Sequence, residues 1–393
     1  MAIQLLPELY EPILAHISNE DTQILCACSL VSTAFRHPAQ KRLFSFLRVP
    51  TGTRSRSYAQ VAGLFAEKPH MAGYVTNLRV ILPSDKEVWR QEQPLAESIF
   101  RQLVNVRKAS IRNYEDEVDN QGYELHAQVL SLLLRILESH GTLQHLTLWC
   151  LNLTKTLFRR ILSAAPSLTF VEVATYLPES SRPAVPFRPN KPIIDLCISQ
   201  SGSVYTQLCI DSELEPCIRQ LRTLEHHGVD NQEDLSPCFL SAATLERLEL
   251  KISSYSFEQR FVLPPSLPSL CELILSIDSC DPPPGIITVL SQNGVPSLTR
   301  LQLTFQDLAA VVPTDQVYSF TLPALQLLDE ALDVHSRVRQ AEWHIRLTYY
   351  DHRQCPEHDT AKHVACLEEK LQQHLPKAFA KGLIVASGEG EFY

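Results

Sequence analysis

The chain has 393 residues, of which 45% are hydrophobic and 20% are charged, and its formal net charge at pH 7 is −9. Its length allows one long hydrophobic core or two domains. The acidic balance, with both signs of charge interspersed, argues against nucleic acid or an anionic membrane surface as the main partner. The N-terminus has no basic stretch followed by an apolar run, and the longest apolar stretch, residues 125–137, contains polar side chains. We therefore expect a soluble protein of the cytoplasm, the nucleus or both.

Apolar residues at helical spacing mark the first 48 residues. Leu9, Ile13 and Ile17 recur every fourth residue, which places them on one face of a short helix that starts near Glu11, with Pro12 at a tolerated early position. Three helices in about forty residues bury too little surface to be stable alone, so this unit must pack on the rest of the chain or on a partner. The apolar stripe of the following helices consists of Leu25, Cys28, Val31 and Phe35.

These residues resemble the F-box, a helical module that docks on the Skp adaptor of cullin-based ubiquitin ligases. The family's Leu-Pro-x-Glu-Leu opening stands here as Leu6-Pro7-Glu8-Leu9, without the spacer residue. Its Leu-Val-Cys-x-x-Trp segment stands as Leu30-Val31-Ser32-Thr33-Ala34-Phe35, with Ser for Cys and Phe for Trp. The alternative is an N-terminal helical cap on a larger domain, without an adaptor. The resemblance implies Skp adaptor and cullin as partners, and as adaptor-binding residues Leu6, Pro7, Leu9, Ile13, Ile17, Leu30, Val31 and Phe35.

Beyond residue 70 a degenerate repeat recurs: an apolar residue, two others, an apolar residue, one other and an apolar residue. First positions are 25 residues apart from Leu143 to Leu168 and from Leu245 to Leu270, and 28 apart from Leu270 to Leu298. This period falls in the range of about 20–29 residues of leucine-rich repeats. The alternation predicts short strands with inward leucines. The copies are Val75-Leu78-Val80, Leu143-Leu146-Leu148, Leu168-Val171-Val173, Leu245-Leu248-Leu250, Leu270-Leu273-Leu275 and Leu298-Leu301-Leu303, with weaker ones at Tyr205-Leu208-Ile210 and Leu221-Leu224-His226.

Segments between these strands are predicted to be helices, notably Leu125 to Leu137 and Thr154 to Ala165. Strands that alternate with helices in a stacked repeat predict an α/β fold with parallel strands. We expect a three-helix F-box-like module over residues 1–48 and an irregular leucine-rich-repeat-like solenoid over residues 49–393. The solenoid should be irregular because the asparagine usual after the third leucine is missing from nearly every unit. The body also resembles the one that follows the F-box in many fungal proteins.

The C-terminal part continues the alternation after a proline-rich insert. Pro178 to Pro192 contains five prolines and cannot form a central strand or helix, so we expect a basic loop outside the solenoid. Further along, we expect a helix at Leu325 to Leu332, a strand at Glu342 to Tyr349, a helix at Thr360 to His374 and a capping strand at Gly382 to Val385.

The sequence has neither a Gly-rich phosphate loop nor a Gly-x-Ser-x-Gly elbow, so we expect no catalytic residues and no cofactor. One C-terminal cluster has spacings that would suit zinc but lacks a Cys-x-x-Cys pair. A polar loop running into an amphipathic helix explains the same residues, and we adopt that interpretation, with zinc as the alternative. The cluster is His352, Cys355, His358, His363, Cys366 and His374.

Side chains between the leucines should point to the opposite, concave face of the sheet. Trp and Arg dominate binding hot spots, which singles out Trp149 and Arg247. Trp149 has an alternative place as a local core residue under the proline-rich insert. The predicted substrate-binding residues are His145, Trp149, Phe170, Arg247, Lys251 and Arg300.

Taken together, the sequence predicts the substrate-recognition subunit of a Skp-cullin-F-box ubiquitin ligase. Such a chain performs no covalent chemistry and holds a protein target near the transfer machinery. The target is not identified by the sequence, and neither nucleic acid nor membrane is expected as a partner. The alternative is a leucine-rich-repeat scaffold that acts without a ligase, and an enzyme is the least supported possibility.

Overall fold

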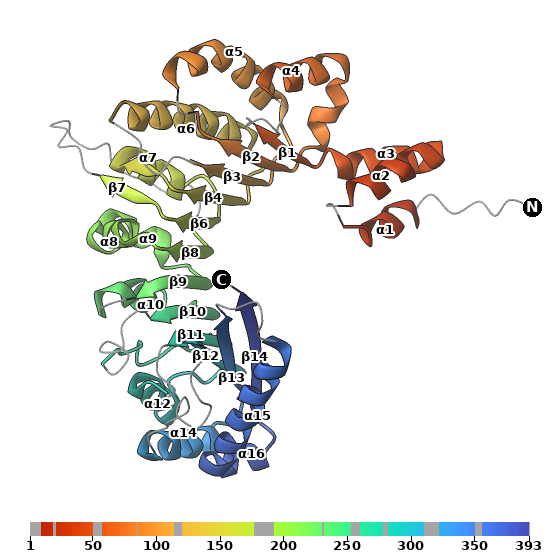
Figure 1. Cartoon of the computed structure of the whole chain (residues 1–393). Helices are drawn as coiled ribbons and strands as arrows, with labels where there is room; N and C mark the ends of the chain where they lie inside the picture. Colours follow the sequence, from red (N-terminus) through yellow and green to blue (C-terminus); the bar gives the residue numbers. More distant parts are fainter. Residues whose placement is uncertain are drawn as a thin grey trace, which may run out of the picture. The chain divides into compact units, whose positions relative to one another are not determined.

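The computed structural model describes residues 9–18, 21–49, 57–83, 85–113, 120–176, 192–229, 232–252, 260–277, 282–309, 322–349 and 356–392. The chain divides into two compact units, Met1–Arg182 and Pro183–Tyr393, each of which is an α/β structure with parallel strands (Figure 1). The N-terminal helices therefore group with the first part of the body, and a separate domain boundary at residue 48 stays a prediction.

Three short helices open the first unit, at the places that the apolar spacing predicts. Pro12 stands in the first turn of the first helix, where its missing N–H costs little. The hydroxyl of Ser32 accepts the backbone N–H of Phe35 at 3.3 Å and so caps the third helix. These helices, hereafter the helical module, are α1 (Tyr10–Ala15), α2 (Thr22–Val31) and α3 (Thr33–Leu43).

The helical module has a small core of its own. Leu14, Leu25 and Ala39 are fully buried, and each comes from a different helix. The guanidinium of Arg42 donates to the carbonyl oxygens of Leu14 and Ile17, both at 2.6 Å. The Leu14 carbonyl also accepts the N–H of Ile17 at 3.0 Å, so the cation adds a second bond at the end of α1 and ties α3 to it. Ile17, Cys28, Phe35 and Leu43 pack partly buried around this core.

Five neighbouring parallel strands follow in the first unit, in the order β1-β2-β3-β4-β6. The longer helices between these strands lie on one side of them (Figure 1). Two further short strands, β5 (Asn152–Thr154) and β7 (Ala174–Tyr176), pair with each other. The main strands are β1 (Phe46–Val49), β2 (Asn77–Ile81), β3 (Lys108–Arg112), β4 (His145–Trp149) and β6 (Ser167–Val171). The helices are α4 (Tyr58–Glu67), η2 (Pro69–Tyr74), α5 (Lys86–Gln102), α6 (Asn120–His140) and α7 (Lys155–Leu162).

The second unit contains seven parallel strands in sequence order. The strands and helices predicted for the C-terminal part are confirmed, except that the last strand begins at Ile384, not at Gly382, and continues well beyond Val385. Its strands are β8 (Asp195–Ser199), β9 (Thr223–Val229), β10 (Arg247–Ile252), β11 (Glu272–Ile277), β12 (Arg300–Ala309), β13 (Gln340–Tyr349) and β14 (Ile384–Phe392). Its helices are α8 (Gly202–Ile210), η3 (Ser212–Leu214), α9 (Glu215–Ile218), η4 (Gln232–Leu235), α10 (Ser236–Leu240), α12 (Pro284–Ser291), α14 (Leu322–Val334), α15 (Pro356–His374) and α16 (Pro376–Ala380).

Leucines of the repeat stack along each sheet. Leu248 pairs in register with Leu273, and Leu273 pairs with Leu301. All three are at most 1% exposed, because successive strands present the same alternation to the same side. Inward burial is confirmed for the copies Val75-Leu78-Val80, Leu143-Leu146-Leu148, Leu221-Leu224-His226, Leu245-Leu248-Leu250, Leu270-Leu273-Leu275 and Leu298-Leu301-Leu303, all at most 3% exposed.

Two copies of the repeat were placed wrongly from the sequence. Leu146 and Leu148 of β4 pair in register with Leu168 and Phe170 of β6. The copy of the repeat on β6 is therefore Ala165-Leu168-Phe170, and it begins at Ala165 and not at Leu168. Phe170 is therefore fully buried, and its prediction as an outward substrate-binding residue was wrong. Tyr205-Leu208-Ile210 lies in the helix α8 and not in a strand. The strand of that repeat is β8, in which Leu196 and Ile198 are buried, and Ile193, two residues before the strand, is buried as well.

The proline-rich insert falls almost wholly outside the described residues, which resume at Pro192. Its predicted position outside the solenoid therefore stays a prediction. In the described part of the chain, every helix is too short or too polar to cross a lipid bilayer.

The register on β6 gives a direct test. We expect Phe170→Ala to lower the free energy of unfolding by about 3–5 kcal/mol, because it leaves a cavity under the sheet. Thr169→Ala, one residue away on the opposite face, should change it by less than ~0.5 kcal/mol. Urea unfolding followed by circular dichroism measures both. Equal effects of the two substitutions would contradict the register.

Candidate functional site

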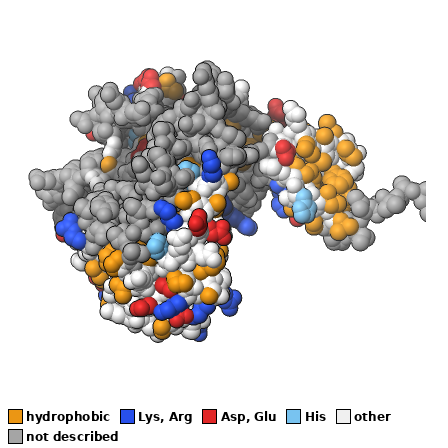
Figure 2. Space-filling view, turned by 60° about the horizontal axis from the view of Figure 1, so that its bottom comes forward, with side chains coloured by type: hydrophobic (Ala, Val, Ile, Leu, Met, Phe, Trp, Pro, Cys, Tyr) orange, Lys and Arg blue, Asp and Glu red, His pale blue; other side chains and the backbone are white. Residues whose placement is uncertain are grey.

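Two surfaces have the character of binding sites, and the first is on the helical module. Large apolar side chains are gathered on its exterior, as Figure 2 shows for the module at the right of the view. Leu30 and Val31 are 81% and 76% exposed, the highest values among them. A patch of this kind on one small module is typical of a protein interface. We call the exposed large apolar side chains of the module, Leu9, Ile13, Ile24, Leu30 and Val31, its apolar face.

The predicted adaptor-binding residues divide into three groups. Leu9, Ile13, Leu30 and Val31 belong to the apolar face. Ile17 and Phe35 pack against the core of the module, so they hold its helices together. Leu6 and Pro7 lie outside the described residues.

Ile24 was missed from the sequence, although a usable signal exists. It stands seven residues before Val31 in the same helix, and positions i and i+7 share one face. Val31 was assigned from the sequence to the same apolar stripe as Leu25, Cys28 and Phe35, but it is 76% exposed and belongs with Ile24 to the outward side of the helix.

The second surface is the face of the second unit's sheet opposite to the buried leucines. Its residues come from alternate positions of successive strands, in rows fixed by the register. One row contains Thr223, Arg247, Glu272, Arg300 and Gln340, and the next contains Glu225, Glu249, Ile274, Gln302 and Glu342. We call these two rows, together with His227, Lys251, Ser276, Thr304, His344 and Arg346, the polar face.

Arginines and glutamates alternate along the polar face and neutralise one another. Arg247 contacts Glu249 at 3.0 Å and Glu272 at 3.4 Å. Arg300 contacts the same Glu272 at 2.7 Å and Glu342 at 3.0 Å. The hydrogen bond to Glu342 raises the pKa of Arg300. The structure thus brings together the two arginines predicted to bind substrate, and both are engaged with carboxylates of the face.

Glu342 is the most enclosed carboxylate of this chain of ion pairs. Its second oxygen accepts the hydroxyl of Ser387 at 2.6 Å. Burial on its own would raise the pKa of Glu342, but the hydrogen bonds from Ser387 and Arg300 outweigh it and the pKa is lowered. The ionised form of Glu342 therefore stabilises the folded state.

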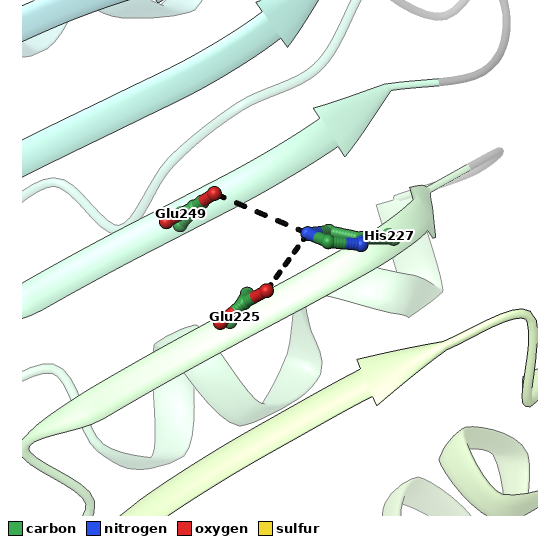
Figure 3. A group of neighbouring side chains, drawn as sticks. All are labelled: Glu225, His227 and Glu249. Carbon is green, nitrogen blue, oxygen red and sulfur yellow. Dashed lines mark ion pairs between the residues drawn. The ribbon is translucent and has the colours of Figure 1, made fainter. Parts of the chain in front are cut away.

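Glu225, His227 and Glu249 form a compact group at another place on the polar face (Figure 3). The Nε2 atom of His227 lies 3.0 Å from a carboxylate oxygen of Glu225 and 4.0 Å from one of Glu249. The three potential ligand atoms all lie within 4.8 Å of one another. Each side chain is between 23% and 35% exposed, so solvent ions can reach the group.

Cys197 adjoins this group from the neighbouring strand, where it pairs in register with Glu225. Its thiol hydrogen-bonds to the Glu225 carboxylate. Burial and the nearby negative charge of Glu225 raise the pKa of the Cys197 thiol to about 12. The hydrogen bond from His227, helped by Cys197 and Arg247, lowers the pKa of Glu225 despite its partial burial. At neutral pH the group therefore presents an ionised carboxylate beside a protonated thiol.

The remaining predicted substrate-binding residues also lie on the faces opposite to the leucines. Trp149 is partly exposed, with the guanidinium of Arg112 5.1 Å from its ring centroid, so it is not a core residue. His145 and Lys251 are partly exposed as well. His145 and Trp149 share β4 of the first unit, whereas Arg247, Lys251 and Arg300 belong to the second unit.

Only part of the predicted histidine and cysteine cluster lies within the described residues. His352 and Cys355 lie outside the described residues, as does the side chain of His358. His363 is buried, while Cys366 and His374 are partly exposed on the same helix, α15. Within the described residues, the group that brings three metal-ligand atoms together is the one at Glu225, His227 and Glu249.

Neither a protein-family model nor a curated protein matches the chain.

The pKa of Glu342 predicts a pH-dependent contribution to stability. Because its pKa is lower in the folded protein than its ordinary value of 4.5, this contribution is fully present above pH 4.5 and is lost as pH falls through the folded value. Glu342→Gln should therefore lower the urea midpoint at pH 7, and the gap to the wild type should narrow between pH 5 and pH 3. Glu330→Gln, on the exposed side of α14, is the control. A gap that widens toward low pH would contradict the assignment.

Proposed function

We propose that this chain is the substrate-recognition subunit of a Skp-cullin-F-box ubiquitin ligase, which docks on the Skp adaptor through its helical module. The observation that carries the proposal is that some apolar residues of that module are buried in its core while others are exposed on its surface. Leu14, Leu25 and Ala39 close its internal core, while the apolar face remains on the outside. Exposed leucine, isoleucine and valine side chains at this density favour burial against a partner.

The F-box-like segment at the end of α2 supports the proposal in detail. Leu30 and Val31 project to the exterior, and the next residue, Ser32, caps α3. Phe35, which stands in the place of the family's tryptophan, packs inside the module and meets the ring of Tyr10 with centroids 4.7 Å apart. Two residues of the segment are thus available to an adaptor, and two fix the geometry of the helices that present them.

The polar face supports a role in holding a target protein. Parallel strands present their side chains in fixed rows, which makes a rigid surface of defined chemical pattern. The chain would bind its target there and hold it near the transfer machinery, so that its contribution to ubiquitylation is proximity. The ladder of Arg247, Glu272, Arg300 and Glu342 supplies such a pattern of alternating charge.

Adaptor docking predicts a specific effect of charge on the apolar face. We expect Leu30→Asp combined with Val31→Asp to weaken binding of purified Skp adaptor to the full chain by at least about 100-fold, since burying an unpaired carboxylate costs several kcal/mol. Isothermal titration calorimetry measures the affinity. Because both side chains are more than 75% exposed, the double variant should unfold at the same temperature as the wild type.

The matched control places the same charges on an apolar surface elsewhere. Leu327 and Val334 on α14 are 53% and 83% exposed, and Leu327→Asp with Val334→Asp should leave adaptor binding unchanged. Equal adaptor affinity of the wild type and the Leu30/Val31 variant would refute docking through this face. Absence of adaptor binding by the wild type would leave a repeat scaffold that acts without a ligase.

A further inference from the structure

We propose that Glu225, His227 and Glu249 form a three-ligand binding site for a transition-metal dication of the zinc class on the polar face. This inference is independent of adaptor docking. It rests on how the parallel strands assemble the donors, on the distances between them and on the groups that orient them.

Strand register brings the donors together. Glu225 and His227 stand two residues apart on β9, so both point to the same side of the sheet. Glu249 on β10 pairs in register with Glu225. Figure 3 shows the carboxylates of the two strands converging on the imidazole of His227. No loop closure is needed to complete the set, because rigid, hydrogen-bonded strands supply all three donors.

The distances fit a tetrahedral ion with small adjustments. Metal–ligand bonds of about 2.0–2.1 Å place neighbouring ligand atoms of a tetrahedral zinc site about 3.4 Å apart. The separations from Nε2 of His227 are 3.0 Å to Glu225 and 4.0 Å to Glu249, one on each side of that value. The two carboxylate oxygens lie within 4.8 Å of each other, so shifts of up to about 1.4 Å in partly exposed side chains bring all three donors to the tetrahedral spacing.

Neighbouring groups hold each carboxylate in place. Glu249 directs Oε1 toward His227, while its Oε2 is bound by the guanidinium of Arg247 at 3.0 Å. Glu225 is oriented by the thiol of Cys197. Such outer hydrogen bonds are the usual supports of metal-binding carboxylates. Cys197 and Arg247 therefore act here as positioning residues.

The donor set selects the class of ion. One imidazole with two carboxylates suits zinc and similar transition metals, whereas calcium and magnesium prefer sites made of oxygen alone. A cation between Glu225 and Glu249 would also relieve the repulsion of two carboxylates at the same register position. Three protein ligands leave a fourth position for water or for a side chain of a bound protein.

The test compares zinc binding by matched variants of the full chain. Metal-free protein is titrated with Zn²⁺ in competition with a chromophoric chelator, and Co²⁺ spectra report tetrahedral coordination. We expect His227→Gln and Glu249→Gln each to weaken binding at one site by at least about 100-fold, since loss of an outer-shell partner alone costs about 10- to 100-fold. Thermal unfolding of each metal-free variant checks its fold, and either variant suffices if the other is unstable.

His344→Gln provides the control for other zinc sites in a chain with 14 histidines and 11 cysteines. His344 lies on the polar face and also neighbours a glutamate, with Glu389 at 3.5 Å. Zinc binding and the Co²⁺ spectrum should be unchanged in this variant. Identical binding by the wild type, His227→Gln and Glu249→Gln would overturn the proposal, as would an equal loss in His344→Gln or absence of zinc binding by the wild type.

Discussion

In-register pairing of parallel strands is the constraint on which both the core and the polar face depend. Because side chains alternate along a strand, a register that aligns Leu248 with Leu273 and Leu301 also aligns Arg247 with Glu272 and Arg300. A slip of one residue would exchange the two faces and expose the leucines. Hydrophobic burial on the helix side therefore fixes the positions of the charges on the other side. The ion-pair ladder is a consequence of packing the core, and its exposed pairs add little stability of their own.

The ladder also constrains how a target could be recognised. Each arginine of the polar face is already paired, so an incoming carboxylate must compete with Glu272 or Glu342. A target whose charges do not match those of the polar face is disfavoured by repulsion. A target whose charges match gains little affinity, because its charges only replace ion pairs that already exist, so such a surface favours specificity over affinity. The apolar face of the helical module has the opposite character, because its exposed side chains have surface to bury. The apolar face of the helical module is thus suited to affinity, and the polar face of the second unit is suited to selectivity.

The sequence predicted the α/β class with parallel strands and most leucine copies because hydrophobic periodicity reports burial directly. It failed where a different apolar residue takes a leucine position. Because Phe170 takes a leucine position on β6, the start of that copy was assigned three residues too late. The copies on β3 and β13 were not recognised, because Ala109 and Ala341 are buried at their leucine positions. The group at Glu225, His227 and Glu249 was not predicted, because it depends on the register between two strands. The Glu-x-His alternation on β9 was visible, but its repeat was weak, with His226 in place of a leucine.

We propose that the helical module links this chain to a cullin ligase. Affinity purification of the full chain from the cells that express it, followed by quantitative mass spectrometry, tests whether that link exists. We expect the Skp adaptor and a cullin among the most enriched proteins, with the adaptor in an amount comparable to the chain itself. An eluate that contains other specific partners but neither adaptor nor cullin would contradict it.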